Sequence, residues 1–464
     1  MQSVVEGQRR RNPQRGRWAV RRSAIAAAAL GMASLSASGM GVPADGIPED
    51  PAGWWSPAFV ERLAQERRQL AEARAPVDLD DGLEEYRAVI HAHSVLSHDS
   101  RGTLADLVET AHATRTRAIF MTEHPSAQRD VYAEGWHGIQ DGVLFVPGAE
   151  TQNLLVWPRT RQDRWRGLAG QAFVDAVRDD GGLVVVCHQD TFRDWDLTGL
   201  HGIEIYNIHV DAKDEPQLGA LFEGTPDFGL LVQMAGVFRD YPLESMAFIL
   251  DDPDPWVRRW DELLRRGPIT AIAGNDAHRN TGFVFRVGAG PAIEVLDALG
   301  EQIARLEPQQ IPGLAAVVGR TPPGTELLRV QLDPYAASFG LAGTYLLAPE
   351  LTEDALRHAL GRGRAFVGFD WLADASGFTA VMAAGAGRWA MGDRVPLSDD
   401  LRLAAEAPLE AAWRLLRDGE NCASGRGRTL DVPIRQTGVY RLELRLSLLG
   451  REWPWIYSNP FYVR

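Results

Sequence analysis

Two pairs of metal-binding residue types occupy matching positions in the chain. His91 and His93 are separated by one alanine, and so are Asp276 and His278. Each pair follows a short apolar segment of strand length, and residues i and i+2 of a strand point to the same side. Each pair can therefore direct two donor groups at one cation. The spacing predicts a metal site to which both pairs contribute.

Further donor residues lie at or just beyond the ends of other apolar segments: Asp99, His124, Glu150 and His188. Imidazoles mixed with carboxylates suit Zn²⁺, Mn²⁺ or Fe²⁺ better than Mg²⁺ or Ca²⁺, which prefer oxygen shells. A carboxylate that bridges two such ions holds them about 3.5–4 Å apart, and water bound there has a pKa of about 7. Glu150 is the candidate for that bridge. These residues predict a hydrolase whose nucleophile is a metal-bridged hydroxide, with Glu150 and Asp276 essential for catalysis.

The elements that position these residues are short apolar segments that alternate with helical stretches. We expect strands at 86–90, 118–121, 143–146, 183–187, 203–206, 230–232 and 269–273. Only 230–232 does not run into polar residues of a catalytic kind. Helices are expected between the strands, for example 103–114 with Thr103 as N-cap, and 170–180. Apolar strands separated by helices indicate a parallel sheet covered on both faces, and polar residues at successive strand ends indicate a β/α barrel. The segments predict a barrel that is seven-stranded or irregular.

The remaining chain divides into other parts. Residues 1–44 combine seven arginines with an apolar run at 24–35 and small residues after it, which predicts a signal peptide and export to the periplasm or the exterior by a Sec or twin-arginine route. Residues 45–84 read as a linker and a helix, and the barrel is expected over 85–320. Alternating residues at 442–448, with segments at 378–382, 409–416 and 430–434, predict a C-terminal α+β or β-sandwich domain over 330–464.

Several motifs resemble those of the PHP (polymerase and histidinol phosphatase) family of metal-dependent phosphoesterases. HAHSVLSHDS (91–100) resembles the opening motif and MTEH (121–124) the second. PGAE (147–150), VVCH (185–188), GIEIYN (202–207) and GNDAH (274–278) follow in the order the family uses. The resemblance covers about residues 85–290. It implies a distorted seven-stranded β/α barrel with two or three Zn, Mn or Fe ions, held by His91, His93, Asp99, His124, Glu150, His188, Asp276 and His278.

One departure from the family concerns the segment after Glu150. The family often has a further histidine there, whereas this chain reads Thr-Gln-Asn-Leu-Leu-Val-Trp. One ion would then lack a ligand, take water in its place, or be absent. His209 is a candidate substitute, and its neighbour Asn207 is better explained as shaping the loop.

Other polar residues near the expected ligands have weaker assignments. His98 precedes Asp99 and is a candidate acid for protonating a leaving group, or else an exposed loop residue. Arg101 and Arg279 adjoin ligands and are candidates for binding a phosphate, or else form surface ion pairs. Four histidines outside the pattern are expected to be structural or exposed: His112, His137, His201 and His358.

Composition limits the partners of the protein. The chain has 48 basic and 62 acidic residues, and without residues 1–44 the balance is 41 to 61. Such an acidic surface disfavours nucleic acid, so we expect a small-molecule substrate. Outside the signal region the sequence contains no window apolar enough for a membrane span. Cys187 and Cys422 are the only cysteines; a disulfide between them is possible in an exported protein but is the less favoured arrangement.

Three functions from different classes fit these residues. The first is a phosphomonoesterase or phosphodiesterase, which the resemblance favours. The second is a hydrolase of carbamate, carboxylester or amide bonds that uses the same metal site, as in the carbaryl-hydrolase branch of the superfamily. The third is a non-catalytic, metal-stabilised binding protein, which a full set of eight ligands disfavours.

Overall fold

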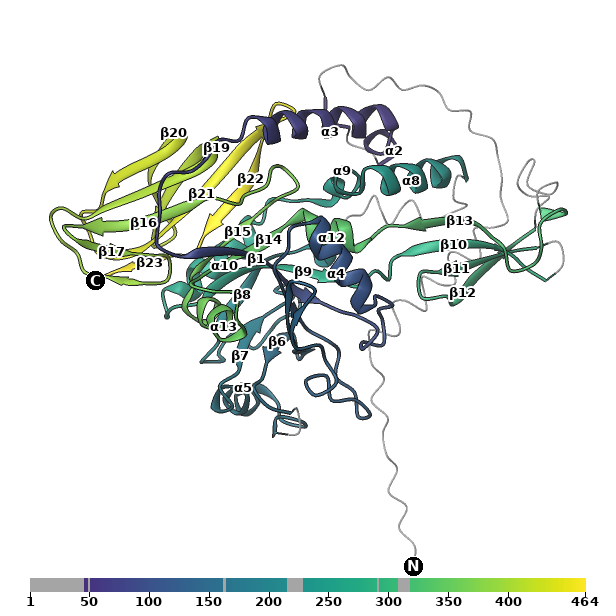
Figure 1. Ribbon diagram of the computed structural model, residues 1–464, viewed down its shortest axis with the longest axis horizontal. Helices are drawn as coiled ribbons and strands as arrows, with labels where there is room; N and C mark the ends of the chain where they lie inside the picture. The colour runs from purple at the N-terminus through teal and green to yellow at the C-terminus, as the bar shows by residue number, and fades with distance from the viewer. Residues whose placement is uncertain (1–45, 49–50, 162–163, 215–227, 290–291, 308–317) are drawn as a thin grey trace, which may run out of the picture.

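The computed structural model describes residues 46–48, 51–161, 164–214, 228–289, 292–307 and 318–464. It is a mixed α/β structure built on large sheets (Figure 1). A central group of strands and helices lies between an all-β region, which holds the C-terminus, and an arm formed by β10–β13. The predicted signal peptide lies outside the described residues. None of the described helices has both the length and the apolar character needed to cross a membrane.

The central strands are short apolar runs, and most pair in parallel. They are β1 (Glu84–Ala92), β2 (Ala118–Met121), β4 (Val143–Val146), β7 (Leu183–Val186), β8 (Gly202–Asn207) and β9 (Thr270–Ala277). β1 pairs in parallel with β2 and β9, β2 with β4, and β8 with β7 and β9. β5 (Ala149–Thr151) and β6 (Leu154–Trp157) form a hairpin, and β6 pairs antiparallel with β7. A bridge from Glu123 to Ala149 joins the end of β2 to β5. The pairing thus leads from β1 around to β9 and back to β1.

Alternate residues of these strands pack on opposite sides, which explains why the strands are apolar throughout. In β2, Ile119 shares a buried cluster with α4 (Leu104–Ala113), whereas Phe120 belongs to a cluster that α13 (Glu353–Arg362) joins. α4 begins after Thr103, whose hydroxyl accepts from the Asp106 backbone N–H, as predicted for an N-cap. Other helices that cover the strands are α5 (Gly170–Asp179) on β7 and α10 (Asp254–Leu264) on β8.

One expected strand is a helix, and some of the observed strands were not expected. Residues 230–232 lie within α8 (Phe228–Asp240), whose buried residues Leu231, Met234 and Val237 recur at helical spacing. A three-residue apolar run fits a strand and a helix equally well, so the prediction there was wrong. The strands absent from the prediction include β6, which lies in the short segment between Glu150 and β7 and runs antiparallel to both of its neighbours.

The C-terminal strands continue the same hydrogen-bonded sheet. β14 (Gly343–Ala348) pairs antiparallel with β1 and with β15 (Ala365–Gly368), which in turn pairs with β22 (Arg451–Ser458). Residues 335–368 therefore pack on the central strands, although the sequence placed them in a separate domain. The expected C-terminal segments fall in β16 (Thr379–Ala384), β19 (Arg402–Arg417), β20 (Glu420–Pro433) and β21 (Gly438–Leu448).

The arm was not expected from the sequence, which assigned residues up to 320 to the barrel. It is a four-stranded antiparallel sheet in the order β12-β11-β10-β13. Its strands are β10 (Gly282–Val287), β11 (Ile293–Asp297), β12 (Gln302–Leu306) and β13 (Glu326–Gln331). β10 starts a few residues after β9, so the arm projects from the end of the last central strand (Figure 1).

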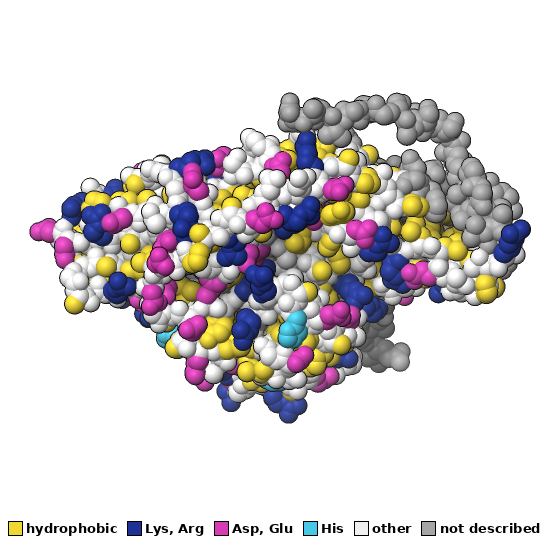
Figure 2. Space-filling view, turned by 45° about the horizontal axis from the view of Figure 1, so that its top comes forward, with side chains coloured by type: hydrophobic (Ala, Val, Ile, Leu, Met, Phe, Trp, Pro, Cys, Tyr) yellow, Lys and Arg dark blue, Asp and Glu magenta, His cyan; other side chains and the backbone are white. Residues whose placement is uncertain are grey.

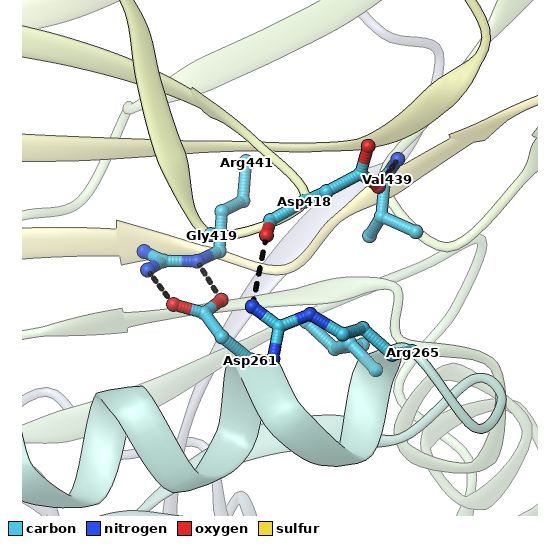
Figure 3. Close-up of a pocket in the computed structure, with 7 residues that line it drawn as sticks. Asp261, Arg265, Asp418, Gly419, Val439 and Arg441 are labelled. Atoms are coloured by element: carbon cyan, nitrogen blue, oxygen red, sulfur yellow. Dashed lines mark hydrogen bonds and ion pairs between the residues drawn. The ribbon is translucent and has the colours of Figure 1, made fainter.

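A buried ion pair ties the all-β region to α10. Arg441 of β21 is 1% exposed, and its guanidinium donates two hydrogen bonds to the Asp261 carboxylate, at 2.8 and 2.7 Å. A third hydrogen bond, at 2.6 Å, goes to Glu443. Figure 3 shows Arg441 reaching from the sheet to Asp261, while Arg265, which directly follows α10, donates to the backbone carbonyl of Asp418. Glu443 also pairs with Arg414, at 3.1 Å, whereas the Asp261 carboxylate is paired with Arg441. Loss of Arg441 therefore leaves buried negative charge at Asp261.

We predict that Arg441→Met lowers the free energy of unfolding by about 3–5 kcal/mol, the usual cost of leaving a buried charge unpaired. Chemical denaturation followed by circular dichroism measures this. Arg402→Met is the matched control, because the Arg402–Asp431 pair is exposed and exposed pairs contribute little. Equal stability of the two variants would contradict the role given to Arg441.

Candidate metal centre

The structure brings the eight expected ligand residues together at the ends of the central strands. They lie in or after β1, β2, β5, β7 and β9: His91, His93, Asp99, His124, Glu150, His188, Asp276 and His278. Four groups of residues have donor atoms that all lie within 4.8 Å of one another, and two of these groups contain four residues each. The first group is His93, Asp99, His124 and His278, and the second is His91, His93, Glu150 and Asp276.

The backbone departs from regular strand geometry where it presents these side chains. The register of β1 shifts between Ile90 and Ala92, so His91 lies in a bulge rather than in a regular His-x-His strand. His91, His188 and Asp276 have φ values of 81°, 51° and 44°, in the left-handed region that side chains other than glycine rarely adopt. Bulges and left-handed residues redirect side chains at functional sites at an energetic cost. The clustering therefore depends on backbone strain that strand periodicity does not predict.

Glu150 places its two oxygens among different imidazoles. Its Oε2 lies 3.2 Å from His91 Nε2 and 3.3 Å from His93 Nε2, whereas Oε1 lies 2.8 Å from His188 Nε2. The two oxygens of Asp276 also face different imidazoles: Oδ1 lies 3.2 Å from His91 Nε2, and Oδ2 lies 3.6 Å from His188 Nε2. A carboxylate that faces two sets of donors has the arrangement of a bridge between cations.

Asp99, His124 and His278 complete the more solvent-exposed side of the cluster. Asp99 Oδ2 lies 3.3 Å from His124 Nε2 and 3.5 Å from His278 Nε2. The His93 and His278 rings stack with centroids 3.9 Å apart. Side-chain exposure is 26% at His124 and 25% at Asp99 but 0% at His91, so the cluster opens to solvent beside Asp99.

Three buried donor atoms of the cluster make no hydrogen bond: His93 Nε2, Asp99 Oδ1 and Asp276 Oδ1. Buried polar atoms without partners are costly, and native proteins rarely keep them. A bound cation accepts a lone pair from each of these atoms. The N–H groups nearby cannot form hydrogen bonds to all three atoms at the same time. The donor set and the unpartnered atoms therefore fit a transition-metal centre.

Charge within the cluster is balanced by shared protons. Burial raises the pKa of Glu150, but the charge of His91 and hydrogen bonds from the imidazoles hold it well below its usual range. Burial lowers the pKa of His91, yet the facing carboxylates, Asp276 first, raise it well above the ordinary value. Hydrogen bonds and charge from Asp276 outweigh burial and raise the pKa of His278 to about 10. Cations that bind here replace these protons, so uptake releases protons and weakens as pH falls.

Glu204 of β8 is a functional residue that the sequence analysis missed. Its Oε1 lies 2.6 Å from His91 Nδ1, and its Oε2 accepts hydrogen bonds from the His188 backbone N–H and from Asn207 Nδ2, both at 3.0 Å. A Cβ at Gly274 would collide with this carboxylate, so the glycine leaves the space that it occupies. A carboxylate on the far ring nitrogen of a ligand histidine fixes its tautomer and orientation. The available signal was an acid in the middle of the apolar strand GIEIYN.

Glu123 holds the segment that leads to Asp99. Its carboxylate is 1% exposed and accepts hydrogen bonds from the backbone and hydroxyl of Ser94 and from the hydroxyl of Ser97. Ser97 Oγ in turn accepts from the His124 backbone N–H at 2.9 Å. Glu123 is next to the candidate ligand His124 in the sequence, and its hydrogen bonds shape the loop that leads to the candidate ligand Asp99.

The remaining candidates lie outside the cluster or at its edge. His98 is 78% exposed, with Nδ1 at 3.9 Å from Asp99 Oδ1. Arg101 donates to the backbone carbonyls of His98 and Ser100, and Arg279 pairs with Asp106 at 2.8 Å. His209 groups with Asp276 and His278. Asn207 caps the turn after β8 through the N–H groups of residues 209 and 210, as its loop-shaping role predicted.

The other histidines and the cysteines behave as expected. His112, His137 and His358 are exposed, and His201 accepts a hydrogen bond from the Val184 backbone N–H. Cys187 is buried, Cys422 is exposed, and both are free thiols.

Comparisons with known proteins give only weak matches. No protein-family model matches the chain. A solved two-domain protein from Bacteroides vulgatus, described as containing a predicted PHP-like metal-dependent phosphoesterase, aligns with 83% of this chain and 98% of its own, at 12% identity and a TM-score of 0.33. That score is too low to support an inference of fold or function. Lipid A acyltransferase PagP of Musicola paradisiaca is 28% identical over 95 residues, 19% of this chain. The match spans half of the length of the acyltransferase.

We predict that the purified protein binds at least two equivalents of a divalent transition metal, because the donors form two groups that share His93. Elemental analysis of chelator-treated protein reloaded with Zn²⁺ or Mn²⁺ measures the stoichiometry. Saturation at one equivalent or fewer would rule out a multinuclear centre.

We also predict that Glu204→Gln weakens metal binding about 10- to 100-fold, the usual effect of removing a carboxylate behind a ligand histidine. Competition with a coloured chelator measures the affinity. Glu294→Gln, in the Arg286–Glu294 pair of the arm, serves as the matched control and should bind metal like the wild type. An unchanged affinity in folded Glu204→Gln would show that His91 needs no such support.

Proposed function

We propose that this protein is a metal-dependent hydrolase that acts on phosphoesters. The division of the Glu150 and Asp276 oxygens between two sets of imidazoles carries the proposal, because this arrangement suits neighbouring cations. The proposed ligands are the eight clustered residues, and Zn²⁺, Mn²⁺ or Fe²⁺ fits their mixed nitrogen and oxygen donors. When bound, the ions supply Lewis acidity and water of lowered pKa.

We propose that the ring of pairings from β1 to β9 is the distorted seven-stranded β/α barrel that the PHP-like motifs imply. Its support is that the pairing returns to β1 and that the donor residues follow strand ends, where β/α barrels carry their sites. The antiparallel β6 accounts for the distortion. The barrel rim then holds the ligands on one side of the sheet.

The side chains at the opening are proposed to handle the substrate. His98 lies beside Asp99 at the exposed side of the cluster, 5.2 Å from the His124 ring, where it can give a proton to a leaving group. Glu204 keeps His91 aimed at the carboxylates, and the bonds of Glu123 fix the loop of Asp99. The buried carboxylates hold negative charge that only cations or protons can balance.

Uncharged esters, carbamates or amides are the second candidate substrates. Arg279 pairs with Asp106, and Arg101 bonds backbone carbonyls, so both guanidinium groups expected to bind a phosphate are engaged elsewhere. A neutral ester needs no such cation. The same ligand cluster would serve this reaction.

We also propose that the protein is exported and acts on small molecules rather than nucleic acid. The basic and apolar residues at 1–44 support export, and the net charge of −14 supports the choice of partner. Figure 2 shows basic and acidic side chains interspersed on the face in view, an arrangement unlike the continuous basic stripe of many nucleic-acid-binding surfaces.

A panel of a phosphomonoester, a phosphodiester, a carboxylester and a carbamate, each with added Mn²⁺ or Zn²⁺, tests the function. We predict hydrolysis of at least one phosphoester, and a loss of several orders of magnitude in Glu150→Gln and Asp276→Asn, since removing the charge removes the bridge. His98→Gln should slow esters with poor leaving groups more than activated esters, which need no proton. His358→Ala, at an exposed position of α13, should retain the wild-type rate.

Circular dichroism first establishes that each variant folds, because loss of a metal also lowers stability. Cleavage of the carbamate or carboxylester alone would favour the second candidate. A folded Glu150→Gln protein with wild-type rate and metal content would refute the proposed site. No hydrolysis of any substrate by metal-loaded wild type would refute the assignment to hydrolases.

A further inference from the structure

The second oxygen of Glu150 has a donor group of its own. Glu150 Oε1 lies 2.8 Å from His188 Nε2 and 3.9 Å from Cys187 Sγ. Donor atoms of these three residues lie within 4.8 Å of one another. This group of Glu150, Cys187 and His188 differs from the group of donors around Glu150 Oε2, which contains His91 and His93. Two sets of donors therefore meet at opposite oxygens of one carboxylate.

Local backbone geometry explains how adjacent residues reach the same oxygen. Cys187 directly follows β7, and its backbone N–H donates to the Asn153 carbonyl at 3.0 Å. Neighbouring residues of a regular strand point to opposite sides. His188 has a φ of 51°, so the alternation ends there, and its N–H donates to Glu204 Oε2 at 3.0 Å. The turn allows both the thiol and the imidazole to approach Glu150.

The Cys187 sulfur lies between an apolar cluster and the carboxylates of the site. Cys187 is 0% exposed and packs in a buried cluster with Leu155, Val185 and Ile272. A thiol that only fills space in an apolar cluster needs no polar neighbour. The Cys187 thiol, however, faces the Glu150 carboxylate, which the candidate metal-binding groups share. Its position suits a metal ligand as well as a core side chain.

We propose that Glu150, Cys187 and His188 hold a metal ion of their own, next to the ions bound by the two groups of histidines and carboxylates. The inference rests on the metal centre of the proposed function and adds a thiolate ligand to it. As the ion binds, a sulfur–metal bond replaces the S–H bond and the proton passes to the buffer. Three protein donors leave one position for water or substrate, as in catalytic zinc sites.

A thiolate ligand determines which ions this position prefers. Soft sulfur favours Zn²⁺, Fe²⁺ or Co²⁺, whereas the harder Mn²⁺ and Mg²⁺ prefer oxygen donors. His209, the other candidate for an additional ligand, groups with Asp276 and His278 and not with Glu150. The extra ligand at the Glu150–His188 position is therefore sulfur.

Cobalt binding tests the inference, because a thiolate bound to Co²⁺ absorbs in the near ultraviolet and oxygen or nitrogen ligands do not. The chain has two cysteines, so each can be removed singly. Metal-free wild type titrated with Co²⁺ should develop the thiolate band. Cys422→Ser, the matched control with Cys187 as its only thiol, should keep the band. Cys187→Ser should lose the band and about one equivalent of Co²⁺, since one of three donors is lost.

Cys422→Ser keeps the test decisive even if Cys187→Ser fails to fold. Absence of the band in Co²⁺-saturated Cys422→Ser would overturn the inference, and so would a band that persists in Cys187→Ser. The hydrolase panel run on the same samples separates the two proposals. Hydrolysis without the band would refute the thiolate ligand alone, whereas the band without hydrolysis would refute the reaction alone. A wild type that binds no Co²⁺ would refute both.

Discussion

Three carboxylates and five imidazoles share a small, largely buried volume at the strand ends, and their mutual charge balance is the constraint on which the surrounding structure depends. Glu150, Asp276 and Asp99 would repel one another strongly in a medium of low polarity. The imidazoles lie between these carboxylates. The arrangement is stable because the imidazoles carry protons, or because cations bind between the imidazoles and the carboxylates. Because these groups lie within hydrogen-bond distance of one another, the strands that carry them must end at the same edge of the sheet.

Hydrogen bonds to the backbone near the cluster hold these strand ends in place. Next to the bulge in β1, the Ile90 backbone N–H donates a hydrogen bond to the side-chain oxygen of Asn275, at 3.2 Å. The amide of Asn275 also donates to the carbonyls of Ser338 and Ala342, both at 2.8 Å. The residue beside Asp276 therefore links the bulge to α12 (Tyr335–Leu341) and the start of β14. Residues that the sequence analysis expected in a separate domain therefore support the candidate metal centre.

The all-β region contributes to the same support from the other end. Arg87 of β1 bonds Thr116 at 2.7 Å and pairs with Asp370 at 2.7 Å, and Asn459 bonds the backbone of Ala271 in β9. Together with the Arg441–Asp261 pair, these contacts fix strands that lead into the ligands. Continuity of the sheet from β1 through β14 and β15 makes the C-terminal region part of the framework of the site.

The sequence by itself determined the candidate ligands and most of the strands that carry them. Strand length, apolar character and a polar ending are local properties, so β1, β2, β4, β7, β8 and β9 were recognised close to their bounds, and the donors at their ends with them. Local patterns could not separate the run at 230–232 from a helix, nor reveal β6 or the arm, because these depend on which segments pair. Only the tertiary structure decided that Glu204 supports His91, that Glu150 divides its oxygens, and that Cys187 faces one of them. Each of these contacts joins residues on different strands. The number of residues between two positions in the sequence does not tell how far apart they lie in the folded protein.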